Sequence, residues 1–599
     1  MAGGKSVTLY LRCTTKDTYM SFVIVLAAPV FFLLILAEWL WGLKLARQGQ
    51  ASAQTYRLDD AISSISLGMI SQIAAIFTRL LRIGIYTLVF EQLSLFPEQT
   101  WWNTWYGYLL ALVFYDLCYY WFHRVSHEVA WFWGGHAVHH QSHHYNLSTA
   151  LRQSTSGVLL GWIFYIPMAL AGVPPLVFGI VALIDLLYQF WVHTEHVGRL
   201  GWFDRWFCSP SNHRVHHAVN DGYVDRNYGG IWVVWDRLFG SFKEEDPAQP
   251  CIYGTRTPLH SWDPLWANVQ VYAELAHDSW HAKRWQDKLM VWLRHPGWRP
   301  ADVAARFPKP AFDVQQFLPY QPRQTRATLV LASAWFVLLL AATMKLLWHM
   351  DDMVWHQAAT CVLAVSAGLW GVNTLLQNRI SGAMCAFVQM AALTVASQVC
   401  GWQELFQMAK PLALLALMYG AWSASHLQPQ VQKWLVRALG LSWVGDVLLL
   451  YPSMFLPGLV AFLAAHVCYI VLLSRDAPWL HSRRALAVFM SIAALVFVLL
   501  DQHGLPADLR VPVAAYVLVI ATMAAQAWGR AKHLGTTGSR WLAWGSVLFM
   551  LSDTLLAVDK FVSPMPVAGL WVLTTYYLAQ GFIVQGRLSS QTHTKVGKA

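Results

Sequence analysis

Long apolar runs recur along the chain, and each run predicts a membrane-spanning helix. The first run, residues 19–43, is longer than the core of a signal peptide and no small-residue cleavage site follows it, so we expect a retained anchor. Pro174 and Pro175 separate the last two runs of the N-terminal half, which predicts a helical hairpin. The runs in this half cover residues 19–43, 63–92, 104–122, 156–173 and 176–194.

A more polar stretch, residues 197–325, follows these runs and is rich in Lys and Arg. By the positive-inside rule, we expect it to face the cytoplasm. Six prolines within residues 296–322 are typical of a linker and mark the best domain boundary. Beyond it, residues 327–585 form a near-continuous series of apolar runs, enough for about eight to ten helices. We therefore predict two domains, residues 1–325 and 326–599.

Composition supports an all-α, polytopic integral membrane protein. The 599 residues are 56% hydrophobic and 12% charged, and the mean hydropathy is +0.39. Soluble globular proteins are nearer to a quarter charged. The chain has 33 Trp, a residue that membrane–water interfaces favour. These values exclude a soluble enzyme, a disordered chain and a small secreted domain held by disulfides.

Charge and cysteine content narrow the possible partners. The net charge of +10 fits cytoplasmic loops held against anionic lipid. No basic run is interleaved with aromatic residues, so we expect no nucleic acid partner. The eight cysteines are scattered and contain no C-x-x-C pair, which indicates neither a disulfide framework nor a thiolate metal site.

Histidines are the strongest chemical signal in the sequence. Twelve of the 24 fall between His123 and His217, in one H-x-x-x-H motif and two H-x-x-H-H motifs. Helical positions i, i+3 and i+4 share one face, so three such faces can enclose two metal ions. Imidazole suits zinc, copper, iron and nickel, which leaves the metal open. Ordinary surface histidines are the alternative, and a zinc protease is disfavoured because the first motif lacks the glutamate of H-E-x-x-H.

This order of motifs resembles the fatty acid hydroxylase/sterol desaturase superfamily of integral-membrane diiron oxygenases, over about residues 60–300. Five further segments are similar to its alkylglycerol monooxygenase branch. That branch hydroxylates the carbon next to an ether oxygen of a glyceryl ether and depends on tetrahydrobiopterin. The matching segments are Tyr145–Gln153, Phe190–Glu195, Ser209–His217, Asp225–Gly229 and Trp235–Gly240.

The resemblance implies two iron ions, dioxygen and a lipid substrate that enters from the bilayer, while the electron donor stays open. A redox metal is required for this chemistry, which excludes zinc. His193 and Glu195, from an H-T-E segment, are implied as part of the site, and the returning hairpin also places His193 on the cytoplasmic side. His143, His144 and His196 do not match the branch. The other implied ligands are His123, His127, His136, His139, His140, His213, His216 and His217.

Supporting residues around the histidines are less certain from sequence. Asp116 lies two helical turns before His123, so it is either a carboxylate that orients a ligand or the partner of Arg124 or Arg152. Three further residues either shape a substrate or pterin pocket or form turns. They are Asn227, Tyr228 and Asp236.

The C-terminal half has few charges inside its apolar runs, and these resemble the YhhN/lysoplasmalogenase family over about residues 370–585. The family hydrolyses the vinyl-ether bond of lysoplasmalogens. The resemblance implies Asp446 and Asp553 as an acid/base pair, and His466 lies in one of the matching pieces. A structural salt bridge of Asp446 with Lys410, or a non-catalytic scaffold, is the alternative. The matching pieces are Lys410–Leu412, Gly445–Asp446, Ala465–Tyr469, Ser552–Asp553, Lys560–Phe561 and Tyr576–Gln580.

We interpret the chain as a membrane-bound diiron monooxygenase acting on glyceryl ethers, joined to a unit that acts on lysoplasmalogen. The metal site is expected on the cytoplasmic side. A sterol or fatty acid hydroxylase or desaturase would use the same histidines. A third reading makes the protein mainly a lysoplasmalogen hydrolase, and a fourth makes it a transporter with an Asp446–Asp553 proton relay.

Overall fold

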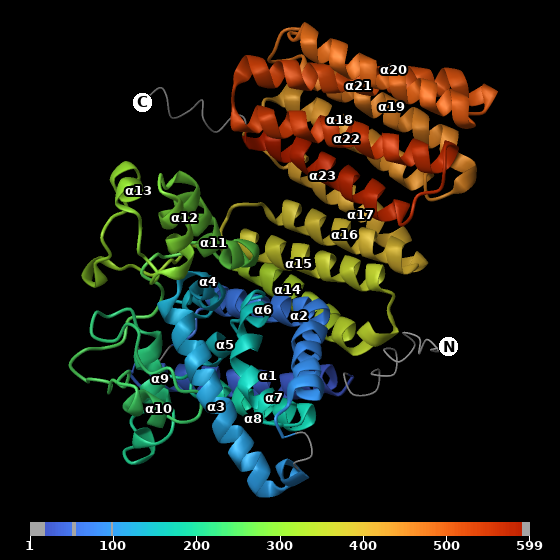
Figure 1. Ribbon diagram of the computed structural model, residues 1–599. Helices are drawn as coiled ribbons and strands as arrows, with labels where there is room; N and C mark the ends of the chain where they lie inside the picture. Colours follow the sequence, from blue (N-terminus) through green and yellow to red (C-terminus); the bar gives the residue numbers. More distant parts are fainter. Residues whose placement is uncertain (1–17, 51–54, 97–99, 590–599) are drawn as a thin grey trace, which may run out of the picture. The chain divides into compact units, whose positions relative to one another are not determined.

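The computed structural model describes residues 18–50, 55–96 and 100–589, and all regular elements in these ranges are helices (Figure 1). Nine helices in the described part of the chain are long and apolar enough to cross a membrane. The predicted all-α, polytopic membrane fold is therefore confirmed. The chain divides into two compact units, residues 1–352 and 353–599.

The first unit contains the histidine motifs. Its α-helices are α1 (Thr18–Arg47), α2 (Leu58–Leu93), α3 (Trp105–Glu128), α4 (Ala130–His140), α5 (Leu147–Ala150), α6 (Gly157–Gly161), α7 (Ile166–Leu170), α8 (Pro175–Trp191), α9 (Pro210–His217), α10 (Val234–Leu238), α11 (Pro264–His281), α12 (Trp285–Leu293), α13 (Ala301–Arg306) and α14 (Arg326–His349). Short 3-10 turns are η2 (Thr100–Asn103), η3 (Trp162–Tyr165), η4 (Phe203–Arg205), η5 (Val314–Gln316) and η6 (Met350–Asp352).

The second unit is a bundle of nine helices with short connections. They are α15 (Trp355–Leu376), α16 (Gly382–Cys400), α17 (Gln403–Trp422), α18 (Pro429–Leu448), α19 (Phe455–Leu473), α20 (Arg483–His503), α21 (Arg510–Leu534), α22 (Thr537–Phe561) and α23 (Ala568–Ser589). The 3-10 turn η7 (Pro452–Met454) lies between α18 and α19, and η8 (Ala507–Leu509) lies between α20 and α21. Buried apolar side chains from most of these helices form one continuous core.

The domain assignment stays a prediction, and the two units divide one helix later than the predicted boundary. Helix α14 packs on α1 and α2 of the first unit, so the units divide after Asp352. The predicted run over residues 156–173 is helical from Gly157 to Leu170, but its middle is a 3-10 turn. The structure has α6, η3 and α7 there, because Pro167 enters the helical path without an N–H to donate. Helices α3 and α8 form, yet neither is among the nine candidate spans.

Packing within the first unit brings its histidine-bearing helices together. Helix α3 packs on α4 and α8, and α4 also packs on α11. Helix α1 contacts α5 and α14. The long segment after α8 carries α9 and α10 and folds back onto α3. The ends of α3 and α8 and the whole of α4 and α9 therefore surround a common interior.

Candidate functional site

Nine buried or half-buried histidines meet in this interior from four places in the chain. Two lie on α3, three on α4, three on α9, and one directly follows α8. They form two groups in which all the ligand atoms lie within 4.8 Å of one another. The first group is His123, His127, His136, His140 and His216, and the second is His139, His193, His213 and His217.

Each of the two H-x-x-H-H motifs contributes histidines to both groups, but in opposite proportions. Helix α4 gives its i and i+4 histidines, His136 and His140, to the first group and His139 to the second. Helix α9 gives only its i+3 residue, His216, to the first group. Its i and i+4 residues, His213 and His217, belong to the second. The 3.6-residue period therefore allows each short helix to bridge the two groups.

Backbone carbonyls fix the orientation of several rings. The Nδ1 atom of His123 lies 2.8 Å from the Tyr228 carbonyl oxygen, and that of His139 lies 3.0 Å from the Arg152 carbonyl oxygen. His193 Nδ1 lies 2.8 Å from the carbonyl oxygen of Gln189. A carbonyl only accepts, so each Nδ1 carries the hydrogen and each Nε2 presents a lone pair to the interior.

Facing lone pairs show that the site fits metal ions. His139 Nε2 and His193 Nε2 are 3.1 Å apart, although neither nitrogen has a hydrogen to donate in this tautomer. Burial lowers the pKa of His139 to about 4, so its ring is neutral at physiological pH. At metal–nitrogen distances of about 2.1 Å, two neighbouring ligands at right angles would be about 3.0 Å apart. A shared cation would therefore turn a repulsive contact into a favourable one.

Further spacings and unpartnered atoms agree with that fit. His136 Nε2 lies 3.0 Å from Nε2 of both His123 and His140 in the first group. The buried Nε2 atoms of His127 and His216 have no hydrogen-bond partner among the described residues. Buried polar atoms normally find a partner, and a bound ion would supply it.

One carboxylate supports the first group from outside. Asp225 lies 3.3 Å from Nδ1 of His127 and 2.9 Å from Nε2 of His295. Its backbone is left-handed, with φ of 58°. Hydrogen bonds from both histidines hold the pKa of Asp225 below its ordinary value, although burial acts to raise it. A carboxylate behind a ligating histidine is a common means of fixing the ring.

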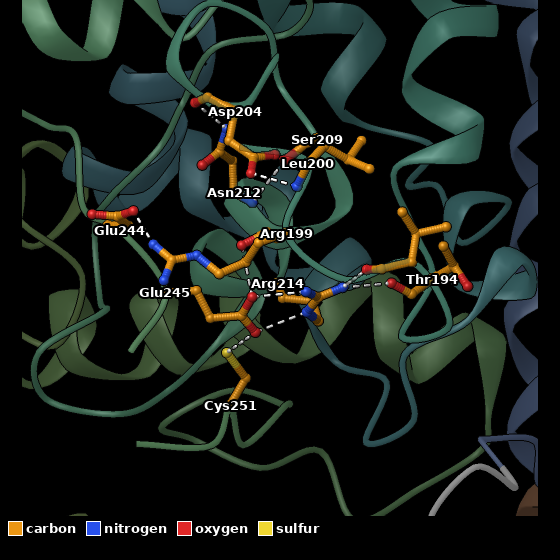
Figure 2. Close-up of polar contacts among 12 residues, drawn as sticks. Thr194, Arg199, Leu200, Asp204, Ser209, Asn212, Arg214, Glu244, Glu245 and Cys251 are labelled. Carbon is orange, nitrogen blue, oxygen red and sulfur yellow. Dashed lines mark hydrogen bonds and ion pairs between the residues drawn. The ribbon is translucent and has the colours of Figure 1, made fainter. Parts of the chain in front are cut away.

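An ion pair holds the second group together (Figure 2). Arg214, on α9 beside His213, donates to both carboxylate oxygens of Glu245 at 2.8 and 2.7 Å. Its third nitrogen donates to the carbonyl oxygens of Thr194 and Val197 at 3.0 and 2.7 Å. This one side chain therefore ties α9 to the segment that begins at His193.

Helix α1 also reaches this segment. Glu38, only 9% exposed on α1, accepts hydrogen bonds from the Thr194 hydroxyl and the Tyr56 hydroxyl. It also accepts from the Leu147 backbone N–H at 2.9 Å. The carboxylate thus joins three segments that are far apart in sequence, next to His193.

A cavity of about 670 Å³ opens beside the first group. The histidines on its wall are His127, His140, His216 and His217. The remainder is mixed in charge and aromatic character. It includes Trp133, Asp225, Arg256, Glu274, Asp278, His295, Arg299 and Lys309. Apolar residues, among them Val219, Val271, Leu275 and Phe312, complete the wall, so the cavity combines charged, aromatic and apolar surfaces.

The second unit has its own buried constellation. Asp446, 2% exposed, accepts a hydrogen bond of 2.6 Å from the Tyr576 hydroxyl and lies 3.5 Å from the Lys410 ammonium nitrogen. Asp553 accepts a hydrogen bond of 2.5 Å from the Tyr516 hydroxyl. That hydroxyl lies 2.9 Å from Nε2 of His466, which is itself 3.5 Å from the Asp553 carboxylate.

A single cavity of about 440 Å³ joins these groups. Asp446, Asp553 and Lys410 lie on its wall with both tyrosines. Most of the remaining wall is apolar, with Leu449, Phe455, Leu459, Val496, Leu500, Val513, Val517 and Phe561 among its residues. A pocket with a few polar groups at one place and apolar walls elsewhere suits an amphiphile.

Comparisons with known proteins match each unit to a different family. The fatty acid hydroxylase family model matches residues 108–241, which span all nine histidines. Alkylglycerol monooxygenase of Xenopus tropicalis is 33% identical over 325 residues, 53% of this chain and 68% of that protein. The chain belongs to the fatty acid hydroxylase family. The human and Danio rerio alkylglycerol monooxygenases are each 39% identical over 46% of this chain, and the chain covers 59% of each.

Beyond its fatty acid hydroxylase part, the chain matches the YhhN family model over residues 405–587. Lysoplasmalogenase TMEM86B of Sus scrofa is 40% identical over 24% of this chain and 59% of that protein. The human protein of that name is 36% identical over 26% of this chain and 62% of its own length. No solved structure matches the chain.

Two predicted site residues of the fatty acid hydroxylase part lie elsewhere or act differently. Glu195 is exposed and belongs to neither histidine group, and its catalytic role stays a prediction. Asp116 pairs with neither Arg124 nor Arg152. It accepts from the backbone N–H of Ile231 at 2.7 Å and from the Trp235 indole at 2.8 Å. The periodicity of α3 shows which face of that helix Asp116 lies on. It gives no information about contacts with α10 and the loop before it, so this role of Asp116 could not be predicted.

The same loop and the start of α10, residues 227–236, contain two other residues that we expected to support the histidines. Asp236 accepts from the N–H groups of Tyr228 and Gly229 at 2.7 and 2.8 Å, so it shapes the turn that presents the Tyr228 carbonyl to His123. Asn227 has φ of 55°, and its side-chain amide donates to the carbonyl oxygens of Asn212 on α9 and of Lys243 at 3.0 and 2.8 Å. These contacts favour a turn-forming role for Asn227 and Asp236 over a role in shaping a substrate or pterin pocket. His143, His144 and His196 lie outside the two groups.

Proposed function

We propose that the first unit is a dioxygen-dependent monooxygenase that hydroxylates the ether-adjacent carbon of glyceryl ethers, using two irons held by the nine histidines. The observation that carries the proposal is the division of these residues into two inward-facing groups. The relatives named alkylglycerol monooxygenase support the substrate class. Bound iron would supply the redox chemistry that activates dioxygen and attacks an unactivated C–H bond.

The chain's own residues have separate tasks in this proposal. Backbone carbonyls keep the Nε2 lone pairs directed inward, and Asp225 fixes His127. Arg214 and Glu38 hold the segment after α8 so that His193 stays against α9. These contacts pre-organise the ligands, and little reorganisation is needed when metal binds.

The cavity of about 670 Å³ beside the first group is our proposed site for the reductant. Its acidic and basic side chains can bind a polar heterocycle such as tetrahydrobiopterin, and Trp133 offers an aromatic face. The lipid would then approach from the bilayer side. We place this centre on the cytoplasmic side because residues 197–325 are rich in Lys and Arg.

Activity of the purified, iron-loaded protein tests the proposal. With tetrahydrobiopterin and oxygen, a 1-O-alkylglycerol should yield a fatty aldehyde and glycerol. Sterol and free fatty acid substrates should remain unchanged in parallel reactions. Conversion of a sterol or fatty acid without glyceryl ether cleavage would favour the rival hydroxylase or desaturase.

The carboxylate pair in its own cavity favours a second function, hydrolysis of the vinyl-ether bond of lysoplasmalogen. In this proposal one carboxylic acid protonates the vinyl carbon, and the other carboxylate takes a proton from the attacking water. The products are a fatty aldehyde and a glycerophospholipid without its chain. Lys410 and Tyr576 hold Asp446, while Tyr516 holds Asp553.

A pair of variants separates catalysis from structure at this cavity. Asp446→Asn should abolish turnover and also lower stability, because it removes the counter-charge of buried Lys410. Adding Lys410→Met removes the stranded ammonium and should restore stability without restoring turnover. Recovery of turnover in the double variant would show that the ion pair is structural and that Asp446 is not catalytic.

A further inference from the structure

The two ends of the C-terminal bundle differ sharply in charge. Its nine helices are 19–25 residues long and follow one another through short connections, so successive helices run in opposite directions (Figure 1). Each Lys, Arg, Asp or Glu of residues 353–589 can therefore be assigned to the nearer end. One end, here called the basic end, contains the start of α20 and the ends of α19, α21 and α23.

The basic end has ten Lys and Arg residues and a single carboxylate, Asp476. The opposite end, here called the cavity end, has three basic residues and six acidic ones. The basic end contains Arg379, Lys433, Arg437, Arg475, Arg483, Arg484, Arg530, Lys532, Arg540 and Arg587. The cavity end contains Lys410, Arg510, Lys560, Glu404, Asp446, Asp501, Asp508, Asp553 and Asp559.

Contacts confirm that each set lies at one end. Asp476, in the α19–α20 connection, pairs with Arg530 near the end of α21 and with Arg587 near the end of α23. These hydrogen bonds and charges lower the pKa of Asp476, although its burial acts to raise it. At the other end, the cavity wall combines Leu449 after α18 with Phe561 at the end of α22. The two sets are thus separated by the length of the helices.

Basic residues near the ends of spans are retained on the cytoplasmic side, and short loops carry the strongest signal. From this asymmetry we infer that the cavity holding Asp446 and Asp553 opens at the non-cytoplasmic face of the membrane. The second unit therefore takes its lipid from the non-cytoplasmic leaflet, a consequence that rests on the vinyl-ether hydrolase proposed above.

The cavity itself fits an entrance at that face. Tyr451 and Pro452, on its wall, belong to the short α18–α19 connection, and Asp559 and Lys560 lie on the wall near the end of α22. Charged side chains at this level match a zwitterionic lipid headgroup. The apolar wall made by α20 and α21 then matches the lipid chain.

Single cysteines at the two ends test the orientation in the full-length protein. Ser453→Cys lies in η7 at the cavity end, and Ser425→Cys lies between α17 and α18 at the basic end. Both serines are exposed, and each change is nearly isosteric. Labelling of the native cysteines is measured on the unchanged protein under the same conditions and subtracted as background.

A membrane-impermeant maleimide mass tag is applied to sealed right-side-out and inside-out vesicles. In right-side-out vesicles, Ser453→Cys should gain one tag per chain over the unchanged protein, and Ser425→Cys should gain none. In inside-out vesicles the pattern should be reversed. Labelling of Ser425→Cys from outside, or of both variants from one side, would overturn the orientation.

Turnover separates this inference from the function on which it rests. A lysoplasmalogen added to sealed right-side-out vesicles should be hydrolysed, whereas sealed inside-out vesicles should show little turnover until detergent is added. Equal turnover in both preparations would refute supply from the non-cytoplasmic leaflet. Absence of turnover in detergent would refute the hydrolase, and the tag pattern would still decide the orientation.

Discussion

Replacing Arg214 with methionine tests how the second histidine group is held. The substitution keeps an unbranched side chain but removes two hydrogen bonds to Glu245 and those to the Thr194 and Val197 carbonyl oxygens. The Arg214 side chain is 9% exposed and that of Glu245 is 20% exposed. Breaking a buried ion pair costs about 3–5 kcal/mol, and the partial exposure of Glu245 favours the lower end.

The neighbouring pair of Arg199 and Glu244 provides a matched control (Figure 2). Their side chains are 43% and 69% exposed, so Arg199→Met should cost at most about 1 kcal/mol. At about 2–4 °C per kcal/mol, Arg214→Met should lower the melting temperature by roughly 10 °C and the control by only a few degrees.

The test measures the melting temperature and the bound metal content of both variants. Arg214→Met should lose metal from the second group in proportion to its loss of stability, because His193 and α9 are no longer joined. Equal melting temperatures and equal metal content for Arg214→Met and Arg199→Met would refute the clamp and the pre-organisation that we assign to it.

Three other substitutions address separate parts of the account. His139→Ala should abolish glyceryl ether cleavage and leave lysoplasmalogen hydrolysis intact, and loss of both activities in folded protein would contradict independent units. Asp225→Asn should weaken metal retention by about 10–100-fold in chelator competition, as for other carboxylates behind ligating histidines, and unchanged retention would argue against its role. Tyr516→Phe should lower hydrolysis with little change in melting temperature, whereas full activity would show that Asp553 needs no hydroxyl donor.

Local spacing accounts for what the sequence predicted well. The i, i+3 and i+4 positions of two H-x-x-H-H motifs lie on one helical face, so their convergence followed from periodicity. Periodicity does not predict which histidine belongs to which group, because that depends on how α4 and α9 pack against each other. His136 and His139, three residues apart, belong to different groups.

Residues that act across long sequence separations were missed for a physical reason. Glu38 contacts Thr194, 156 residues away, and Asp116 holds a loop more than 110 residues later. No local pattern marks such a partner, and the apolar surroundings of Glu38 predicted only an anchor. The 3-10 turn η3 within the run at 156–173 was also unexpected, since the apolar composition of the run outweighed the signal from Pro167.

Metal stoichiometry tests the central claim most directly. The protein is loaded with ferrous iron without oxygen, freed of loose metal, and measured by elemental analysis against chain concentration. The account predicts about two irons per chain, falling to about one in His193→Ala, which belongs only to the second group. One iron per chain in the unchanged protein, or oxygenase activity that requires copper instead, would contradict it.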